Sequence, residues 1–213
     1  QPQPTYSFTR FESGKERLIT APQFPDLIVQ HLFYNHLKHY YFPRFSAYSY
    51  ACIDGRGTHR AMFKSFQFYK NFDYVLKLDV KKFFPSVRIE ILKGKLEKKI
   101  EDREILNLCL SFYPDDIGMP IGFLLSQLFA NVFLDSIDKH IEQRRFRFIR
   151  YMDDIFVFGN DVRRLKDLKD DLEWELERLD LKLKNWSLVS TEQPFTSIGY
   201  KFHGKSVFLK KRT

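Results

Sequence analysis

Apolar residues along the chain recur at two spacings, which together predict an α+β domain. Spacing of three to four residues predicts helices over 25–42 and 161–180, and a long helix that follows Pro120 and Gly122. Residues 88–112 are also helical in pattern, in two parts that break near 100–103. Strand-like runs, the first of them a hairpin around Gly14, cover residues 10–20, 74–80, 146–158, 182–189, 196–202 and 206–210. This order of elements predicts an antiparallel sheet backed by helices.

The sequence contains three Asp-Asp pairs, and they differ in what surrounds them. Asp115-Asp116 lies between Pro114 and Gly118 and is expected in a solvated loop, whereas Asp170-Asp171 falls within a helical pattern, on or near its polar face. Only Asp153-Asp154 stands between two strand-like apolar runs, in FIRYMDDIFVF. The apolar flanks favour burial, and adjacent carboxylates repel each other unless a positive charge lies on them. Taken alone, the pair is also compatible with a simple hairpin turn.

A further carboxylate, Asp79, changes that interpretation. It lies near the end of the strand-like run YVLKLDV. Aspartates from two strand regions can converge and hold two divalent ions, and Mg²⁺ suits such a site because it takes oxygen ligands and leaves positions open for phosphates. Two such ions activate an attacking 3′-hydroxyl and stabilise a leaving pyrophosphate. The alternative is a strand cap, or a salt bridge with Lys81 or Lys82.

Several long segments, in order, resemble the motifs of reverse transcriptases. LDVKKFFPSV, GMPIGFLLSQLFANVFLD and RYMDDIFVF resemble the palm motifs, and residues 12–33, 49–61 and 196–202 resemble a fingers motif, the motif after it and the primer-grip hairpin. The resemblance implies a right-hand polymerase fold with fingers over 1–72 and palm over 73–213. A small fingers-like helical insertion is expected near 88–115, and a thumb is expected to be absent from this chain.

The resemblance also implies a set of metal ligands. Asp79 and Asp153 are expected to bind Mg²⁺, with the backbone carbonyl of Val80 helping to hold the ion that carries the nucleotide. Asp154 is expected to be a looser ligand or an electrostatic support. Two Mg²⁺ ions are implied, for which Mn²⁺ can substitute.

Contacts to substrate are implied in the same way. Tyr151 and Met152 are expected to touch the primer end, with packing within the hairpin as the alternative. Arg17, with Lys15 as a helper, resembles the fingers arginine that neutralises the incoming triphosphate; ordinary solvated charge is the alternative. Phe84 matches the steric gate that crowds a 2′-hydroxyl and favours deoxynucleotides. A looser match suggests Lys182 or Lys184 as a cation for the departing pyrophosphate.

One departure from the common motif points to a subgroup. Where many reverse transcriptases have Pro-Gln-Gly and then Ser-Pro, this chain has Pro-Ile121-Gly122 and then Ser-Gln127, which resembles diversity-generating retroelement enzymes. Residues 55–60 are similar to that group too, and Ile121, Gly122 and Gln127 are expected near the incoming nucleotide. The resemblance implies a bacterial or phage enzyme, with a small basic accessory protein, that makes error-prone cDNA. Group-II-intron-like, retron-like and phage-defence reverse transcriptases remain alternatives.

Composition agrees with a nucleic-acid partner. The net charge is +8 and 17% of residues are aromatic, with 23 Phe. Basic surfaces attract polyphosphates and aromatic rings can stack on bases, although most of the Phe residues are expected in the core. An RNA template, a DNA or RNA primer and deoxynucleoside triphosphates are the expected partners.

The sequence also bears on where the protein acts and on its extent. No apolar stretch approaches the roughly 18 residues that cross a membrane, and isolated Cys52 and Cys109 suit a reducing cytosol. Because the first residue is Gln rather than Met, upstream sequence is expected. A nucleic-acid-binding fragment without turnover is the alternative to an enzyme, but the presence of all three carboxylates favours the enzyme.

Overall fold

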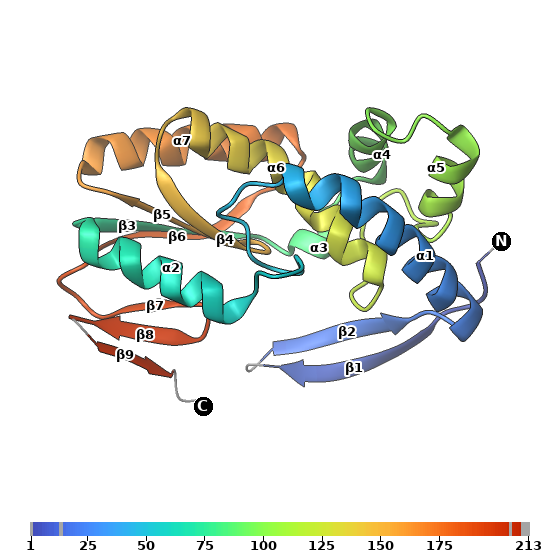
Figure 1. The fold of residues 1–213 in the computed structure, drawn as a ribbon, viewed down its shortest axis with the longest axis horizontal. Coiled ribbons are helices and arrows are strands. Elements are labelled where there is room, and N and C mark those ends of the chain that lie inside the picture. Colours follow the sequence, from blue (N-terminus) through green and yellow to red (C-terminus); the bar gives the residue numbers. More distant parts are fainter. Residues whose placement is uncertain (1, 13–14, 205, 210–213) are drawn as a thin grey trace. The chain divides into compact units, whose positions relative to one another are not determined.

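The computed structural model describes residues 2–12, 15–204 and 206–209, and the chain divides into two compact units (Figure 1). The first unit comprises the described residues up to Phe45 together with Lys82–Phe133, and the second comprises Ser46–Lys81 together with the described residues from Leu134 to Leu209. The expected boundary between residues 72 and 73 falls within the second unit. Each unit is made of separate stretches of the chain, so one cut in the sequence does not divide them. The fingers and palm boundaries therefore stay a prediction.

The first unit begins with a β-hairpin and is otherwise helical. Strands β1 (Tyr6–Glu12) and β2 (Lys15–Ala21) pair antiparallel, as the hairpin prediction around Gly14 requires. The expected break near 100–103 is present between α4 (Ile89–Glu97) and α5 (Arg103–Leu110). Asp102 caps α5 by accepting hydrogen bonds from the amides of Glu104 and Ile105. The helices are α1 (Phe24–Tyr41), α3 (Phe83–Ser86), α4 (Ile89–Glu97), α5 (Arg103–Leu110) and the start of α6 (Leu124–Gln143), with a 3-10 turn at Phe42–Arg44.

The second unit is built on a four-stranded antiparallel sheet. Its strand order is β4-β5-β3-β6, and the bounds are Tyr74–Val80 for β3, Arg147–Tyr151 for β4, Asp154–Gly159 for β5 and Leu183–Ser190 for β6. A smaller antiparallel sheet follows, made of β7 (Phe195–Ser197), β8 (Tyr200–His203) and β9 (Ser206–Leu209). The sheet-and-helix arrangement predicted from the apolar pattern is confirmed.

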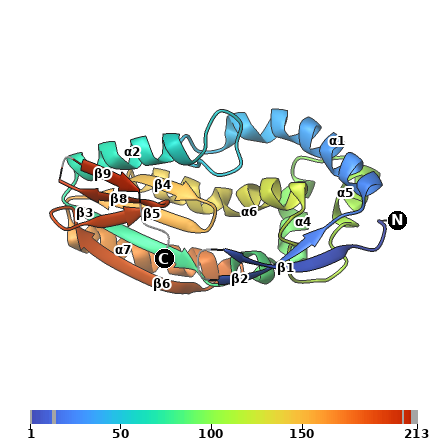
Figure 2. The same ribbon diagram turned by 90° about the horizontal axis from the view of Figure 1, so that it is seen from below.

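Helices cover both faces of the four-stranded sheet. Helix α2 (Thr58–Asn71) contacts β4, while α7 (Val162–Arg178) contacts β3 and β5, and Figures 1 and 2 show the two helices on opposite sides. Side chains alternate along each strand, so Val75, Phe156 and Phe158 pack with α2 and the small sheet. Because β5 is buried on both faces, its sequence is a continuous apolar run.

Helix α2 lies in a stretch for which the apolar pattern predicts no element. Its buried positions are Ala61, Met62, Ser65, Phe68 and Tyr69, which is helical spacing with one small polar member. The Asp115-Asp116 pair is exposed in a loop, and Asp170-Asp171 lies on α7, as expected. Among the described helices, none combines the length and the apolar character needed to cross a membrane.

Candidate active site

Two of the candidate carboxylates stand side by side on neighbouring strands. Asp79 near the end of β3 and Asp154 at the start of β5 are register partners, and both side chains are half-buried. Directly opposed residues of an antiparallel pair place their Cβ atoms about 4.5–5.5 Å apart on the same face of the sheet. The sheet itself therefore brings together two groups that lie far apart in sequence.

The third carboxylate lies in the tight turn between β4 and β5. Tyr151 and Asp154 are register partners, so Met152 and Asp153 form a two-residue loop. Met152 has a positive φ of 55°, a conformation that two-residue hairpin loops use but that a non-glycine residue adopts at a cost of about 1–2 kcal/mol. The Tyr151 hydroxyl lies 3.0 Å from Thr58 Oγ1 at the start of α2. The backbone of the turn is thus strained at Met152, and the contact between Tyr151 and Thr58 joins the turn to helix α2.

A β-bulge next to Asp79 supplies a cation. Asp79 pairs with Asn185 and Val80 pairs with Leu183, so Lys184 is the extra residue of β6. Bulges re-aim side chains, and the Lys184 ammonium lies 3.1 Å from Asp79 Oδ2. Of the two lysines named from the sequence, Lys184 is the one at the carboxylates, whereas the Lys182 carbonyl accepts the Lys81 amide at 2.8 Å.

A buried ion pair lies next to this turn, and its two residues are not among those predicted from the sequence. Arg150 and Asp138 have no exposed side-chain surface, and they pair at 2.6 Å. The sequence does carry a signal for it: Arg150 interrupts an apolar strand, and Asp138 occupies a helical position between the buried residues Leu134 and Ile141. Opposite charges at two positions that the pattern assigns to the core predict a partnership.

The donor chemistry fits Mg²⁺. Asp79, Asp153, Asp154 and the Val80 carbonyl offer only oxygen, which Mg²⁺ prefers, and Mg²⁺ in phosphoryl-transfer sites is held by one or two carboxylates plus water and substrate phosphates. Within the described residues, no group of three or more His, Cys, Asp or Glu side chains is arranged to hold a metal ion. Their oxygen donors are thus chemically suited to Mg²⁺ that is also held by substrate oxygens.

In the first unit, the Ile121-Gly122 turn lies against the β-hairpin. The Thr20 amide donates a 2.8 Å hydrogen bond to the Ile121 carbonyl. Gly122 has a φ of 121°, and a Cβ built on it would stand 2.5 Å from the Thr20 carbonyl oxygen. Glycine is required here because no side chain fits between the two backbones.

The other nucleotide-binding candidates also lie in the first unit. Arg17 is exposed on β2, and its register partner is Arg10. Phe84 is half-buried, whereas its neighbour Phe83 is 2% exposed and belongs to the core. Gln127 is partly buried in the first turn of α6. The side chain of Lys15 lies outside what the structure describes.

The fold is that of a polymerase-type protein. A family model for reverse transcriptase (RNA-dependent DNA polymerase) matches residues 5–202, and the chain belongs to this family. The reverse-transcriptase resemblance of the sequence is confirmed at this level.

Relatives and solved structures agree with the family. The chain is 25% identical over 179 residues to the group II intron-encoded protein LtrA of Lactococcus lactis subsp. cremoris, covering 76% of this chain and 30% of that protein. It is 32% identical over 103 residues to the retron Ec73 reverse transcriptase of Escherichia coli, covering 41% and 33%. Apo telomerase from Candida tropicalis, truncated from its C-terminal domain, superposes with a TM-score of 0.67 at 15% identity, covering 96% and 54%. This shared fold is a polymerase fold, and the chain spans a third or less of the length of the two curated relatives.

Proposed function

We propose that the chain carries the active site of an RNA-directed DNA polymerase. It would add deoxynucleotides to the 3′ end of a primer annealed to an RNA template. The observation that carries this proposal is the pairing of Asp79 with Asp154, next to the turn that holds Asp153, in a chain of the reverse transcriptase family.

The reaction is one nucleotidyl transfer per step. The primer 3′-oxygen forms a bond to the α-phosphorus of the triphosphate, the bond from that phosphorus to the bridging oxygen breaks, and pyrophosphate leaves. Asp79, Asp153 and the Val80 carbonyl would hold Mg²⁺, which when bound favours deprotonation of the 3′-hydroxyl and stabilises charge on the phosphates. Asp154 would add negative potential, and Lys184 beside Asp79 would offset the repulsion between the carboxylates.

Substrate selection would rest on residues of the first unit. Arg17 is exposed and positively charged, which suits contact with a triphosphate. Phe84 presents a half-buried ring that would crowd a 2′-hydroxyl, while Ile121, Gly122 and Gln127 would border the nucleotide.

The primer and template would be held by other features. Tyr151 and Met152, in the turn that carries Asp153, would contact the primer end. A net charge of +8 favours a nucleic-acid partner, because basic side chains displace the counterions that surround phosphates.

Single-nucleotide addition on a defined duplex tests this function. The 213-residue chain is mixed with a labelled DNA primer on an RNA template, Mg²⁺ and one complementary triphosphate. Addition of the deoxynucleotide, loss of addition with a chelator, and poor use of the ribonucleotide are expected. Tight binding of the duplex without any addition would contradict the proposal and favour a nucleic-acid-binding fragment.

Within the family, we propose the error-prone retroelement subgroup, on the basis of Ile121-Gly122 and Gln127. Isoleucine at 121 cannot donate or accept a side-chain hydrogen bond, so an incoming nucleotide would be positioned less firmly than by glutamine. Sequencing cDNA made from an adenine-rich template tests this: frequent errors opposite adenine are expected. Uniform, low error rates would favour a group-II-intron-like, retron-like or phage-defence enzyme, and intron and retron enzymes are among the relatives.

A further inference from the structure

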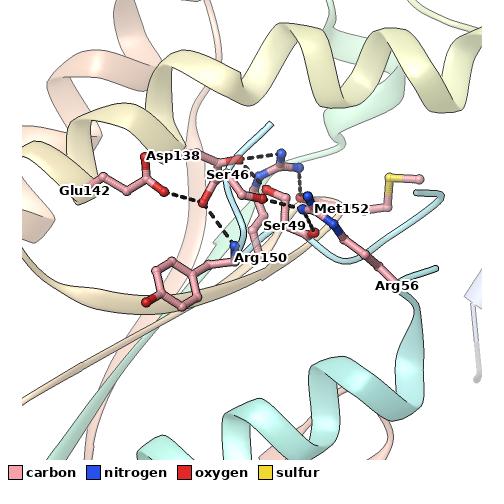
Figure 3. Close-up of polar contacts among 8 residues, drawn as sticks. Ser46, Ser49, Arg56, Asp138, Glu142, Arg150 and Met152 are labelled. Carbon is pink, nitrogen blue, oxygen red and sulfur yellow. Dashed lines mark hydrogen bonds and ion pairs between the residues drawn. The ribbon is translucent and has the colours of Figure 1, made fainter. Parts of the chain in front are cut away.

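The buried ion pair of Arg150 and Asp138 lies next to the turn, and a contribution to stability does not explain its presence. Arg150 Nε and Nη2 donate to the two carboxylate oxygens of Asp138 at 2.6 and 2.7 Å, a bidentate pair (Figure 3). Ser49 Oγ also donates to Asp138. Removing two charges from water is costly, and apolar replacements of buried pairs are often as stable or more so. The pair therefore calls for a role in holding a specific geometry.

The third donor of the guanidinium reaches the turn itself. Arg150 Nη1 donates to the Met152 carbonyl at 3.2 Å. Because the guanidinium is planar and two of its nitrogens are fixed on Asp138, the third nitrogen can hold the carbonyl in only one place. Met152 is the residue with the positive φ of 55°, and Asp153 follows it directly.

A loop over residues 46–57 pairs with the backbone of Arg150. Arg150 N donates to the Tyr48 carbonyl at 2.9 Å, and the Tyr50 amide donates to the Arg150 carbonyl at 3.0 Å. Arg56 donates to the carbonyl of Ser49 at 2.7 Å and also to that of Ser46. Figure 3 shows Asp138 and Met152 bonded to the Arg150 guanidinium. Helix α6 and the turn therefore fix the side chain of Arg150, while the loop fixes its backbone.

We propose that Arg150 is a positioning residue, which fixes the Met152 carbonyl so that the strained turn presents Asp153 toward Asp79. This inference rests on the proposed function for its consequence in catalysis. In this arrangement Asp138, Ser49 and Arg56 act through Arg150 and touch no substrate. Arg150 and Tyr151 are consecutive strand residues, so their side chains lie on opposite faces of the sheet. Tyr151 shares its face with its register partner Asp154 and with Asp79, whereas Arg150 lies on the other face.

The test removes the network without leaving buried charge. The triple variant Arg150→Met/Asp138→Leu/Ser49→Ala replaces the pair with apolar side chains of similar size and removes the hydroxyl that would lose its acceptor. Its matched control is Arg144→Met/Asp171→Asn, which removes an exposed arginine–aspartate pair in the same unit. Three quantities are measured: the rate of single-nucleotide addition, the Mn²⁺ concentration that half-saturates the protein, and amide hydrogen exchange in a peptide over residues 151–155.

The triple variant is expected to melt near the wild-type temperature. Its addition rate should fall about tenfold to a hundredfold, since a misplaced catalytic group costs that much. Half-saturation should need several-fold more Mn²⁺, and the turn amides should exchange faster. The control should match wild type in all three. A purely structural role would leave Mn²⁺ affinity and turn exchange unchanged in the folded triple variant, and that result would overturn the proposal.

A conservative variant gives an independent reading. Arg150→Lys keeps the buried charge for Asp138 but has no fork to reach the Met152 carbonyl, so it should fold and still show fast turn exchange. Slow, wild-type exchange in Arg150→Lys would also overturn the proposal. If wild type adds no nucleotide at all, the proposed function fails, while Mn²⁺ affinity and turn exchange still decide the role of Arg150.

Discussion

The turn at Met152-Asp153 and the turn at Ile121-Gly122 belong to different units and meet opposite requirements. Both have positive φ, 55° at Met152 and 121° at Gly122. The first must display side chains from a strained backbone, so it keeps a non-glycine residue and is held by Arg150. The second must let two backbones approach, so it has no side chain at Gly122 and is held by the Thr20 amide.

This difference shows how a chain can hold an irregular turn in two ways. Where function needs the side chain, strain persists and the surrounding structure must over-determine the conformation. Where two backbone segments must approach each other closely, glycine removes the strain and one backbone hydrogen bond is enough to hold the turn. The first solution needs distant, buried polar partners, and the second needs only a local contact.

The largest expected effect on stability is at Gly122. Gly122→Ala places a methyl group 2.5 Å from the Thr20 carbonyl oxygen and forces alanine into a backbone region used almost only by glycine. Strain alone costs about 1–3 kcal/mol, and the clash adds to it. Denaturant unfolding measures the loss.

Gly199→Ala is the matched control for this substitution. Gly199 also has a positive φ, 79°, but a methyl group added there would meet no atom within 4 Å beyond its immediate chain neighbours. Its loss should therefore come from backbone strain alone and be the smaller of the two. Equal losses at both sites would contradict the close-approach account.

A smaller effect is expected at Thr58, which holds the turn through the Tyr151 hydroxyl at 3.0 Å. Thr58→Val keeps the shape and removes the hydrogen bond, so it should cost about 1 kcal/mol. A double-mutant cycle with Tyr151→Phe checks the cause. Coupling of roughly 0.5 kcal/mol or more between the two changes is expected, and strict additivity would mean that the two hydroxyls do not interact.

The smallest expected effect, and one of opposite sign, is at Met152. Met152→Gly removes the positive-φ strain but adds freedom to the unfolded chain, so the net stability should rise by no more than about 1 kcal/mol. The addition rate should nevertheless fall, because glycine loosens the turn and removes a candidate primer contact. Thermal melting and single-nucleotide addition are measured on the same preparation. A large loss of stability would show that the turn is not strained in the way described.

Much of the fold follows from the apolar pattern. The pattern predicts β3 at its observed bounds of 74–80. Strand β4 lies within the predicted 146–158, and β5 ends one residue beyond it, at Gly159. Asp79, Asp153 and Asp154 can be named from sequence because each lies at or beside the end of a strand-like apolar run, in motifs that resemble those of reverse transcriptases. The residues that contact these aspartates cannot be predicted in the same way.

Those partners depend on register and on contacts between distant segments. Lys184 reaches Asp79 only because β6 carries a bulge, and no local pattern distinguishes it from Lys182. The pattern places the charges of Arg150 and Asp138 at core positions, but only the contact between strand β4 and helix α6 shows how they meet. The contact between Gly122 and Thr20 likewise joins segments that lie far apart in the chain.

The central claim is that Asp79 near the end of β3 and Asp153 in the turn before β5 would hold the metal ions for nucleotide addition. The most direct measurement is the single-turnover addition rate of Asp153→Asn, compared with Asp116→Asn from the exposed acidic pair. Asp153→Asn is expected to lose about a hundredfold or more while its melting temperature holds or rises, because one ligand charge and one repulsion disappear together. Asp116→Asn should remain near wild type, as surface substitutions usually do. A folded Asp153→Asn protein that adds nucleotides at the wild-type rate would contradict the account.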